Sequence, residues 1–378
     1  MMSGDVRIEP CSFHDLDAVQ RFIHDHWRAG HILSRDRELL LWQYDPHRAT
    51  SLGFEGPSIL LARSGEQIIG MLGIIPAEFN FRGHCKSGAW MAILNVVQEA
   101  RSTLAGLKLL NVLPTKGLQA IAVLGINEHV AQVYRGLKYE LLADLPRWVA
   151  VVDEQASRAL LPSDASPHSL DDLCERHRLP TDINDNGVFD VRSIDHLFGA
   201  EWDEFELRSL GRLYVGTRRS AAYLNWRYTN HPSFRYTRLL ARTRHREKAG
   251  LAIYRLETPI GHHERVMRVV EFLGEEGALR ALAARIAIDA REHRVAFADF
   301  YCASERFARP LADVGFHRQW TEPEKTVLPC RLQPIEHGAF PMRGAFLISR
   351  DVSEFSGRLL AADDLYITKS DGDMDRPN

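Results

Sequence analysis

The chain has 378 residues, of which 45% are hydrophobic and 26% charged, a composition typical of globular proteins. Its formal net charge of −3 provides no global attraction to nucleic acid or to an anionic membrane. Because no apolar run could cross a bilayer and the N-terminal residues lack the apolar core of a secretory signal, we expect a cytoplasmic protein without a membrane span. Five scattered cysteines form no C-x-x-C pair, which argues against a disulfide framework or a zinc ribbon.

The first half of the chain alternates patterns typical of strands and helices. A helix near the N-terminus is indicated by apolar residues at helical spacing, namely Leu16, Val19, Phe22 and Ile23. Pro46 is expected to stop a second helix. The full order expected is a strand at 6–8, these helices at 12–23 and 35–44, a hairpin at 59–75, a strand at 89–97, a helix ending near 115, a strand at 120–127, a helix containing 130–137 and a strand region at 139–152. This order predicts a mixed α/β fold, with a largely antiparallel sheet flanked by helices.

The second half repeats this order after a segment rich in Pro, Ser and Asp. The motif Trp42-Gln43-Tyr44 recurs as Trp226-Arg227-Tyr228, and each copy precedes a hairpin-like pair of strands. We interpret the repeat as a tandem duplication. The predicted organisation is a first module at 1–152, a connector at 153–205 with one short helix, a second module at 206–350 and a C-terminal tail at 351–378.

A change of period marks the most informative stretch, residues 94–110. Leu94 to Val97 read as the end of a buried strand, and a short polar turn that contains Arg101 leads into a helix. The first N–H groups of a helix lack partners within it and lie at the positive end of its dipole. An anion site at this turn is therefore one interpretation, and an ordinary strand–helix junction is the other.

Two motifs together resemble the GNAT superfamily of acyl-CoA-dependent N-acyltransferases. The family's R/Q-x-x-G-x-G/A sequence is matched by Arg101 and Gly106, whereas Leu104 replaces the middle glycine. We expect Leu104 to lie in the first helical turns without a positive φ. Asn127 and Tyr134 match the family's second signature, an Asn at a strand end with a Tyr seven residues later, whereas Lys138-Tyr139 replaces the Gly-Phe that follows.

The resemblance implies a fold of two tandem GNAT-like modules and an acetyl-CoA site in the first. It implies that the strand edge at Leu94, Asn95 and Val96 pairs with the pantetheine arm and polarises the thioester carbonyl. Asn127 would bind pantetheine, and Tyr134 would protonate the departing thiolate. The pyrophosphate would lie near Arg101 on the backbone N–H groups of Ser102, Thr103, Leu104, Ala105, Gly106 and Leu107.

The second module lacks these features. Glu275 and Glu276 stand at its corresponding turn, where two carboxylates would repel a pyrophosphate. Ser304 and Leu311 occupy the positions of the Asn and the Tyr. We therefore expect one working acetyl-CoA site per chain, without a metal.

The segment Trp226 to Pro232 and the C-terminal ending resemble tandem GNAT-like proteins of bacterial surface-polysaccharide biosynthesis. This resemblance implies an amine acceptor such as a nucleotide- or lipid-linked amino sugar. The alternatives are an aminoacyl-tRNA-dependent Fem-type transferase and a non-catalytic acyl-CoA-binding protein, and the sequence leaves a homodimer open. The tail is interpreted either as a disordered end or, from the strand-like run 366–368, as ordered. Candidates for the general base are Glu78, His47, Asp371 and Asp373.

Overall fold

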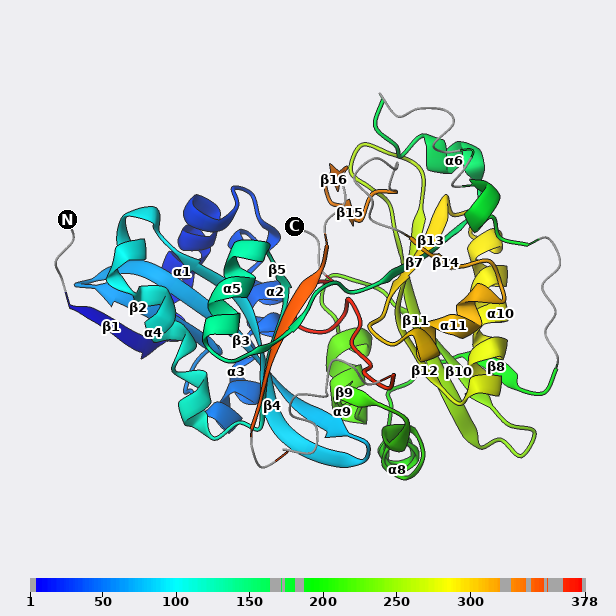
Figure 1. Ribbon diagram of the computed structural model, residues 1–378, viewed down its shortest axis with the longest axis horizontal. Helices are drawn as coiled ribbons and strands as arrows, with labels where there is room; N and C mark the ends of the chain where they lie inside the picture. The colour runs from blue at the N-terminus through cyan, green and yellow to red at the C-terminus, as the bar shows by residue number, and fades with distance from the viewer. Residues whose placement is uncertain are drawn as a thin grey trace.

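Two β-sheets flanked by helices stand side by side, one built mainly from the first half of the chain and the other mainly from the second (Figure 1). The computed structural model describes residues 5–163, 171, 174–180, 187–319, 328–337, 341–349, 352 and 363–375. The prediction of a mixed α/β fold with two modules is confirmed by these sheets.

The two sheets have the same strand order. In the first it runs β1 (Val6–Pro10), β2 (Ile59–Ser64), β3 (Gln67–Phe81), β4 (His84–Val96), β5 (Ala120–Ile126), β17 (Arg343–Ile348) and β6 (Glu140–Leu142). In the second it runs β8 (Asp190–Ser193), β10 (Thr237–Arg242), β11 (Lys248–Glu257), β12 (Val266–Gly274), β13 (Phe297–Tyr301), β7 (Arg147–Val151) and β14 (His317–Arg318). In both, the fourth and fifth strands pair in parallel, while the other described neighbours are antiparallel. A short strand, β9 (Val215–Thr217), extends the first sheet by pairing with the end of β3.

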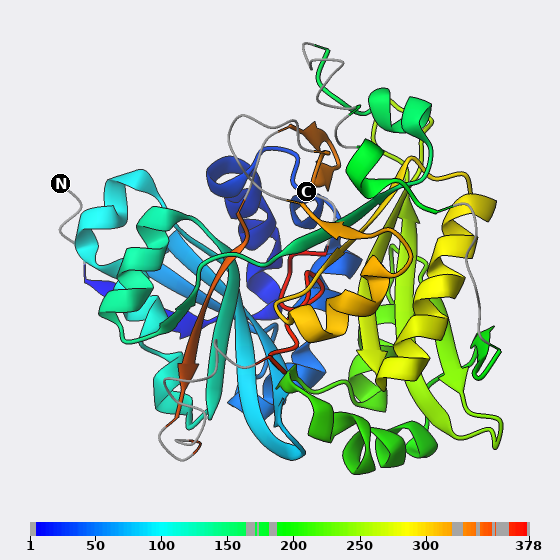
Figure 2. The same ribbon diagram turned by 45° about the vertical axis from the view of Figure 1, so that its right-hand side comes forward.

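Each sheet takes one strand from the other half of the chain. Strand β7 follows β6 directly in the chain but crosses over and pairs with β13, where Ala298 faces Ala150. In return, β17 pairs with β5, where Phe346 faces Ala122, and it is the orange strand among the strands of the first sheet in Figures 1 and 2. The predicted strand region at 139–152 is thus divided between the sheets. The division of the chain into modules at 1–152 and 206–350 stays a prediction, because the sheets share strands across these ranges.

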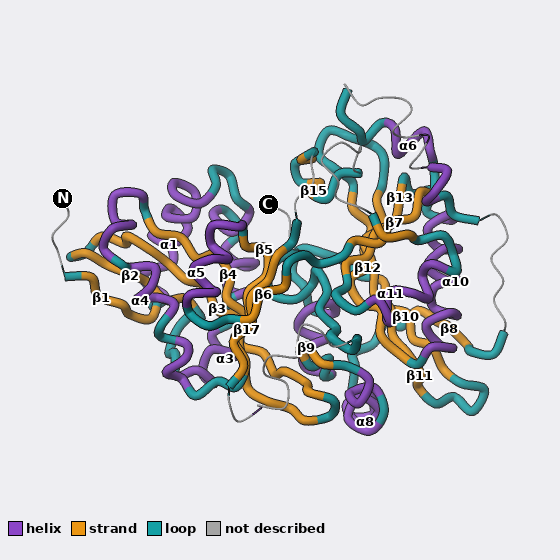
Figure 3. Tube along the Cα trace, viewed as in Figure 1, coloured by secondary structure: helices purple, strands orange, loops and turns teal. Residues whose placement is uncertain are grey.

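Helices flank both sheets, and α10, which lies on the second sheet, is the longest of those described (Figure 3). Pro46 begins α3 instead of only stopping the preceding helix, because Pro suits the first helical position and the Asp45 carboxylate accepts a hydrogen bond from the N–H of His47.

The connector contributes more than the one short helix predicted. The helices are α1 (Leu16–Phe22), α2 (Arg37–Gln43), α3 (Pro46–Ala49), α4 (Ala105–Leu110), α5 (Glu128–Gly136), α6 (Glu154–Arg158), α8 (Ala200–Arg208), α9 (Ala221–Leu224), α10 (Glu276–Glu292) and α11 (Glu305–Ala312).

The repeated W-x-Y motif forms a contact between the two halves. The indole rings of Trp42 and Trp226 stack with centroids 4.9 Å apart. Each indole Nε1 donates to the backbone carbonyl of the other tryptophan, at 3.1 Å in both directions. The equivalent residues of the two copies therefore meet each other, as expected for two related units packed about a local twofold axis.

The C-terminal segment, residues 363–375, runs between the two sheets and is red in Figure 1. It is an ordered part of the core rather than a disordered end, because Tyr366, Ile367, Thr368 and Asp371 are fully buried. Its backbone makes single bridges to Val215 and Cys302, which belong to the two different halves.

Candidate functional site

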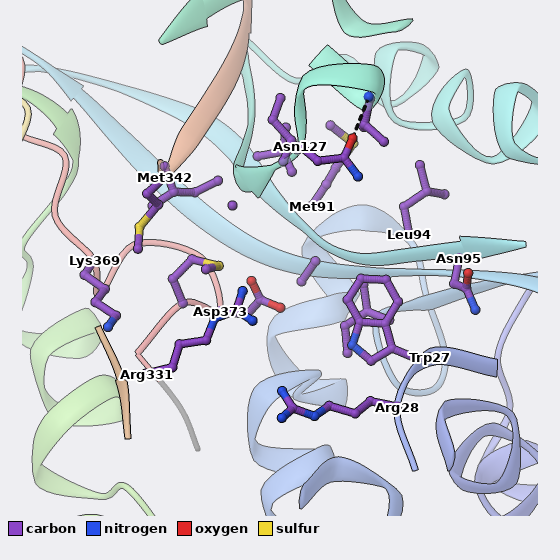
Figure 4. Close-up of a pocket in the computed structure, with 18 of the residues that line it drawn as sticks. Trp27, Arg28, Met91, Leu94, Asn95, Asn127, Arg331, Met342, Lys369 and Asp373 are labelled. Carbon is purple, nitrogen blue, oxygen red and sulfur yellow. Dashed lines mark hydrogen bonds between the residues drawn. The ribbon is translucent and has the colours of Figure 1, made fainter. Parts of the chain in front are cut away.

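The candidate site begins where β4 and β5 separate. The two strands pair in parallel from Gly88 and Ala120 to Met91 and Val123, and beyond this point they diverge. The register of β4 against β3 shifts at the same level, where Ile93 has a φ of 47°. A cavity of about 770 Å³ opens at this fork, lined by residues of both halves (Figure 4).

The cavity brings together half of the residues predicted for acetyl-CoA binding and catalysis. One wall contains Leu94, Asn95, Val96, Arg101, Asn127 and Tyr134. Residues 102–107 do not line the cavity and form the turn and helix next to it. The Arg101 side chain connects the two regions, because its Nε donates to the backbone oxygen of Val96 at 3.4 Å.

The turn after β4 differs from the prediction in one respect. Residues Gln98–Thr103 form a 3₁₀ turn, α4 begins at Ala105, and Leu104 between them has a φ of 61°. The expectation that Leu104 avoids a positive φ is wrong, because Leu104 is the single residue that links the 3₁₀ turn to α4. This left-handed conformation costs a non-glycine residue about 1–2 kcal/mol. Among the described residues no side chain caps α4, so its first N–H groups stay available at a position where Leu104 is 59% exposed.

Asn127 and Tyr134 are both positioned by α5. Asn127 is the N-cap residue, and its Oδ1 accepts a hydrogen bond from the N–H of Val130 at 2.9 Å (Figure 4). The cap occupies the side-chain carbonyl, so the amide NH₂ is the group that can donate to a ligand. Tyr134 lies two turns along the helix, with its ring packed edge-on against Tyr139 at 5.0 Å. Burial raises the pKa of the Tyr134 phenol, which keeps it protonated as a donor at the cavity wall.

Among the four candidate bases, Asp373 alone lines the cavity. Glu78 pairs with Arg218 at the far end of β3, and His47 lies on α3. Both oxygens of Asp371 accept from Arg219 at 3.0 Å, in a pair that is completely buried.

The neighbours of Asp373 fix its place at the fork. Gly372 lies against the indole of Trp90 on β4, and Met374 lies against Gly125 on β5. Gly125 has a φ of 81°, and a Cβ there would lie 2.5 Å from the sulfur of Met374. The C-terminal segment thus crosses the point where the two strands part, with Asp373 between its two contacts.

Sequence reasoning missed the opposite wall of the cavity. It is rich in charged side chains on or near the second sheet, among them Arg255, Glu257, Arg268, Arg331 and Lys369. Arg255 pairs with Asp375 at 3.1 Å, and Arg268 pairs with Glu257 at 2.8 Å. A usable signal was present, since Arg255 and Arg268 interrupt otherwise apolar strands where charge is costly without a partner.

The equivalent fork of the second sheet is filled by the chain itself. Beyond the last parallel pair of β12 and β13, Val269 with Phe300, the hydroxyl of Tyr366 accepts from the N–H of Phe272 at 2.7 Å. Ser370 donates to the carbonyl of Val270, and Ile367 accepts from the N–H of Ala303. The C-terminal segment therefore occupies the space that stays open in the first sheet.

Neither a metal centre nor a membrane span is found in the part of the chain that the structure describes. No group of three or more His, Cys, Asp or Glu side chains there is arranged to hold a metal ion. None of the described helices is long and apolar enough to cross a bilayer.

The sequence matches no protein-family model and no curated protein. Solved structures do resemble it. A GCN5-related N-acetyltransferase from Anabaena variabilis aligns over 91% of this chain and 73% of its own, at 10% identity and a TM-score of 0.58. One from Kribbella flavida aligns over 91% and 72%, at 16% identity and a TM-score of 0.56. The N-myristoyltransferase of Saccharomyces cerevisiae, solved with myristoyl-CoA, aligns over 92% and 79%, at 12% identity and a TM-score of 0.53. These likenesses show that the chain has the fold of the GCN5-related N-acetyltransferases.

Proposed function

We propose that this protein is an acetyl-CoA-dependent N-acetyltransferase with one acetyl-CoA site, at the fork of the first sheet. The observation that carries the proposal is the cavity at this fork, where the edge of β4, Asn127 and Tyr134 meet. The acceptor would be a small amine, with an amino sugar suggested by the resemblance of residues 226–232. The fold shared with acyltransferases supports the same reaction class.

The residues at the fork suit the pantetheine arm. Beyond Met91 the edge of β4 that faces β5 pairs with no strand of the described residues, so its backbone groups can bind the amides of an extended ligand. An N–H group of residues 94–96 would polarise the thioester carbonyl, and the Asn127 amide would add a donor. The pyrophosphate would then extend toward Arg101 and the uncapped start of α4, outside the cavity.

The proposed chemistry is direct transfer in a ternary complex. Asp373 takes a proton from the acceptor ammonium, and the neutral amine attacks the thioester carbon. A carbon–nitrogen bond forms, the carbon–sulfur bond breaks, and Tyr134 gives its proton to the departing thiolate. The second proton that the nitrogen loses restores the Tyr134 phenol, so one proton is released per turnover.

The second fork would take no part in this reaction. Its space holds the C-terminal segment, and Glu275 and Glu276 are exposed at the start of α10. Both features support a single acetyl-CoA site per chain.

Acetyl transfer to a panel of amino sugars, corrected for hydrolysis of acetyl-CoA, tests the proposal. Tyr134→Phe is expected to lower kcat by about 100-fold while the affinity for acetyl-CoA stays nearly unchanged, because only the proton donor is lost. Tyr139→Phe is the matched control, since its buried hydroxyl has no hydrogen-bond partner among the described residues and does not line the cavity.

Equal turnover of wild type and Tyr134→Phe would exclude the acid role of this tyrosine. Acetyl-CoA binding without transfer to any amine would instead favour a non-catalytic acyl-CoA-binding protein.

A further inference from the structure

One cation on the cavity wall differs from its neighbours. The Lys369 side chain lies on the C-terminal segment, and its Nζ donates to the backbone oxygen of Cys330 at 3.0 Å. Nζ also lies 4.9 Å from the centroid of the Tyr301 ring. Within the described part of the chain, no carboxylate lies within ion-pair distance of this ammonium group.

The two arginines on the same wall are neutralised by the protein. Arg255 lies 3.0 Å from Glu257 and 3.1 Å from Asp375. Arg268 lies 2.8 Å from Glu257 and 3.6 Å from Asp299. The ammonium form of Lys369 thus has a charge that these carboxylates do not balance at contact distance, and it faces a cavity large enough for a small molecule.

The surroundings of Lys369 disfavour its charged form. Burial, followed by the nearby charge of Arg268, lowers the pKa of Lys369 to about 7. The groups that face it are Arg268, Asp299, Tyr301, Cys330 and Asp375, and Asp373 lines the same cavity. An anion that enters the cavity would restore the balance and hold the ammonium form.

Lys369 and Asp373 come from the same segment and line the same cavity. In Figure 4, Lys369 lies at the side away from Leu94 and Asn95, and Asp373 is closer to them. We infer that the acceptor carries a carboxylate or phosphate near its amine, and that Lys369 binds this anionic group while Asp373 faces the amine. The inference rests on the proposed function, because it assigns the cavity beyond the thioester to the acceptor.

The anion contact has a defined pH dependence. Below about pH 7 Lys369 is already protonated, so binding needs no proton uptake. Above that pH the anion must draw a proton onto Lys369, and affinity falls by up to about tenfold per pH unit. Binding of an anionic ligand therefore raises the pKa of Lys369 and is weaker in alkaline solution.

The experiment compares kcat/KM for three acceptors, which are glucosamine, glucosamine phosphate and the uronic acid of glucosamine. The kcat/KM of the wild type should be about tenfold or more higher for an anionic acceptor than for glucosamine. Comparison of the phosphate with the uronic acid shows which anionic group is recognised. Lys369→Met should remove this preference. Lys369→Arg should keep it but lose the decline between about pH 7 and pH 9, because Arg stays charged.

Two measurements separate this inference from general damage. Lys116→Met removes an exposed lysine outside the cavity and should retain the wild-type preference. Acetyl-CoA binding by Lys369→Met, measured by isothermal titration calorimetry, should match the wild type.

If the wild type and Lys369→Met both acetylate all three acceptors equally well, this inference is wrong and the proposed function stands. If the wild type acetylates none of a wider amine panel either, the proposed function fails, and the inference fails with it.

Discussion

At the scale of single residues, the least expected feature is the buried ion pair of Arg219 and Asp371. Arg219 also donates to Glu271 at 2.9 Å, and Tyr228 and Tyr366 donate to the same carboxylate at 2.6 and 2.8 Å. All of these groups are buried, so each charge depends on its partners for compensation. The network fixes the C-terminal segment and thereby the position of Asp373.

Asp371→Asn should lower the free energy of unfolding by about 3–5 kcal/mol, because it leaves part of the Arg219 charge buried without a counter-ion. Chemical denaturation of the purified protein measures this change. Asp17→Asn is the control, since Asp17 forms a largely exposed pair with Arg37 and should change stability by less than about 1 kcal/mol. Similar losses for the two variants would show that the buried pair is not a special source of stability.

The residue scale also shows a limit of sequence reasoning. Asp371, Asp373 and Asp375 alternate along the chain and read as similar. The structure gives them different surroundings, because Arg219 binds the first, the second lines the cavity, and Arg255 and Tyr236 bind the third. Partners more than 100 residues away decide these differences, and local patterns carry no information about them.

At the scale of elements, the turn between β4 and α4 is where sequence and structure agree best. The change from strand to helical period is a local property, so the order of strand, polar turn and helix was predictable. The conformation of Leu104 was not, because it depends on how the 3₁₀ turn and α4 are joined. The backbone of a leucine at a position that favours glycine is strained, and substitution tests this strain.

Leu104→Gly removes the strain of the left-handed conformation but adds freedom to the unfolded chain. The two effects nearly cancel, and the free energy of unfolding should stay within about 1 kcal/mol of the wild type. Leu107→Gly, at a helical position without this strain, should lose stability by about 1 kcal/mol in addition to its lost packing. Thermal denaturation of both variants measures the difference, and a larger loss for Leu104→Gly would contradict this account of the turn.

At the scale of the whole molecule, the reciprocal exchange of β7 and β17 ties the two halves together. Hydrophobic periodicity predicted a strand at β7 and made no prediction at β17. It cannot tell which sheet a strand joins. Separating the halves would break the pairing of β7 with β13 and of β17 with β5. We therefore expect the two sheets to unfold together, and tests of function need the full chain.

The same view explains why two related forks differ. The C-terminal segment fills the fork of the second sheet and crosses the mouth of the fork in the first. A fold with two similar sheets can in this way keep one fork open and supply it with Lys369 and Asp373.

Isothermal titration of the full chain with acetyl-CoA tests whether the chain has a single acyl-CoA site at the first fork. The expected stoichiometry is one site per chain. Arg101→Glu, which reverses an exposed charge within the turn, should weaken binding by about tenfold or more. Arg280→Glu, at the start of the corresponding helix of the second half, should leave the affinity unchanged. Two sites per chain, or weaker binding in Arg280→Glu but not in Arg101→Glu, would contradict the account.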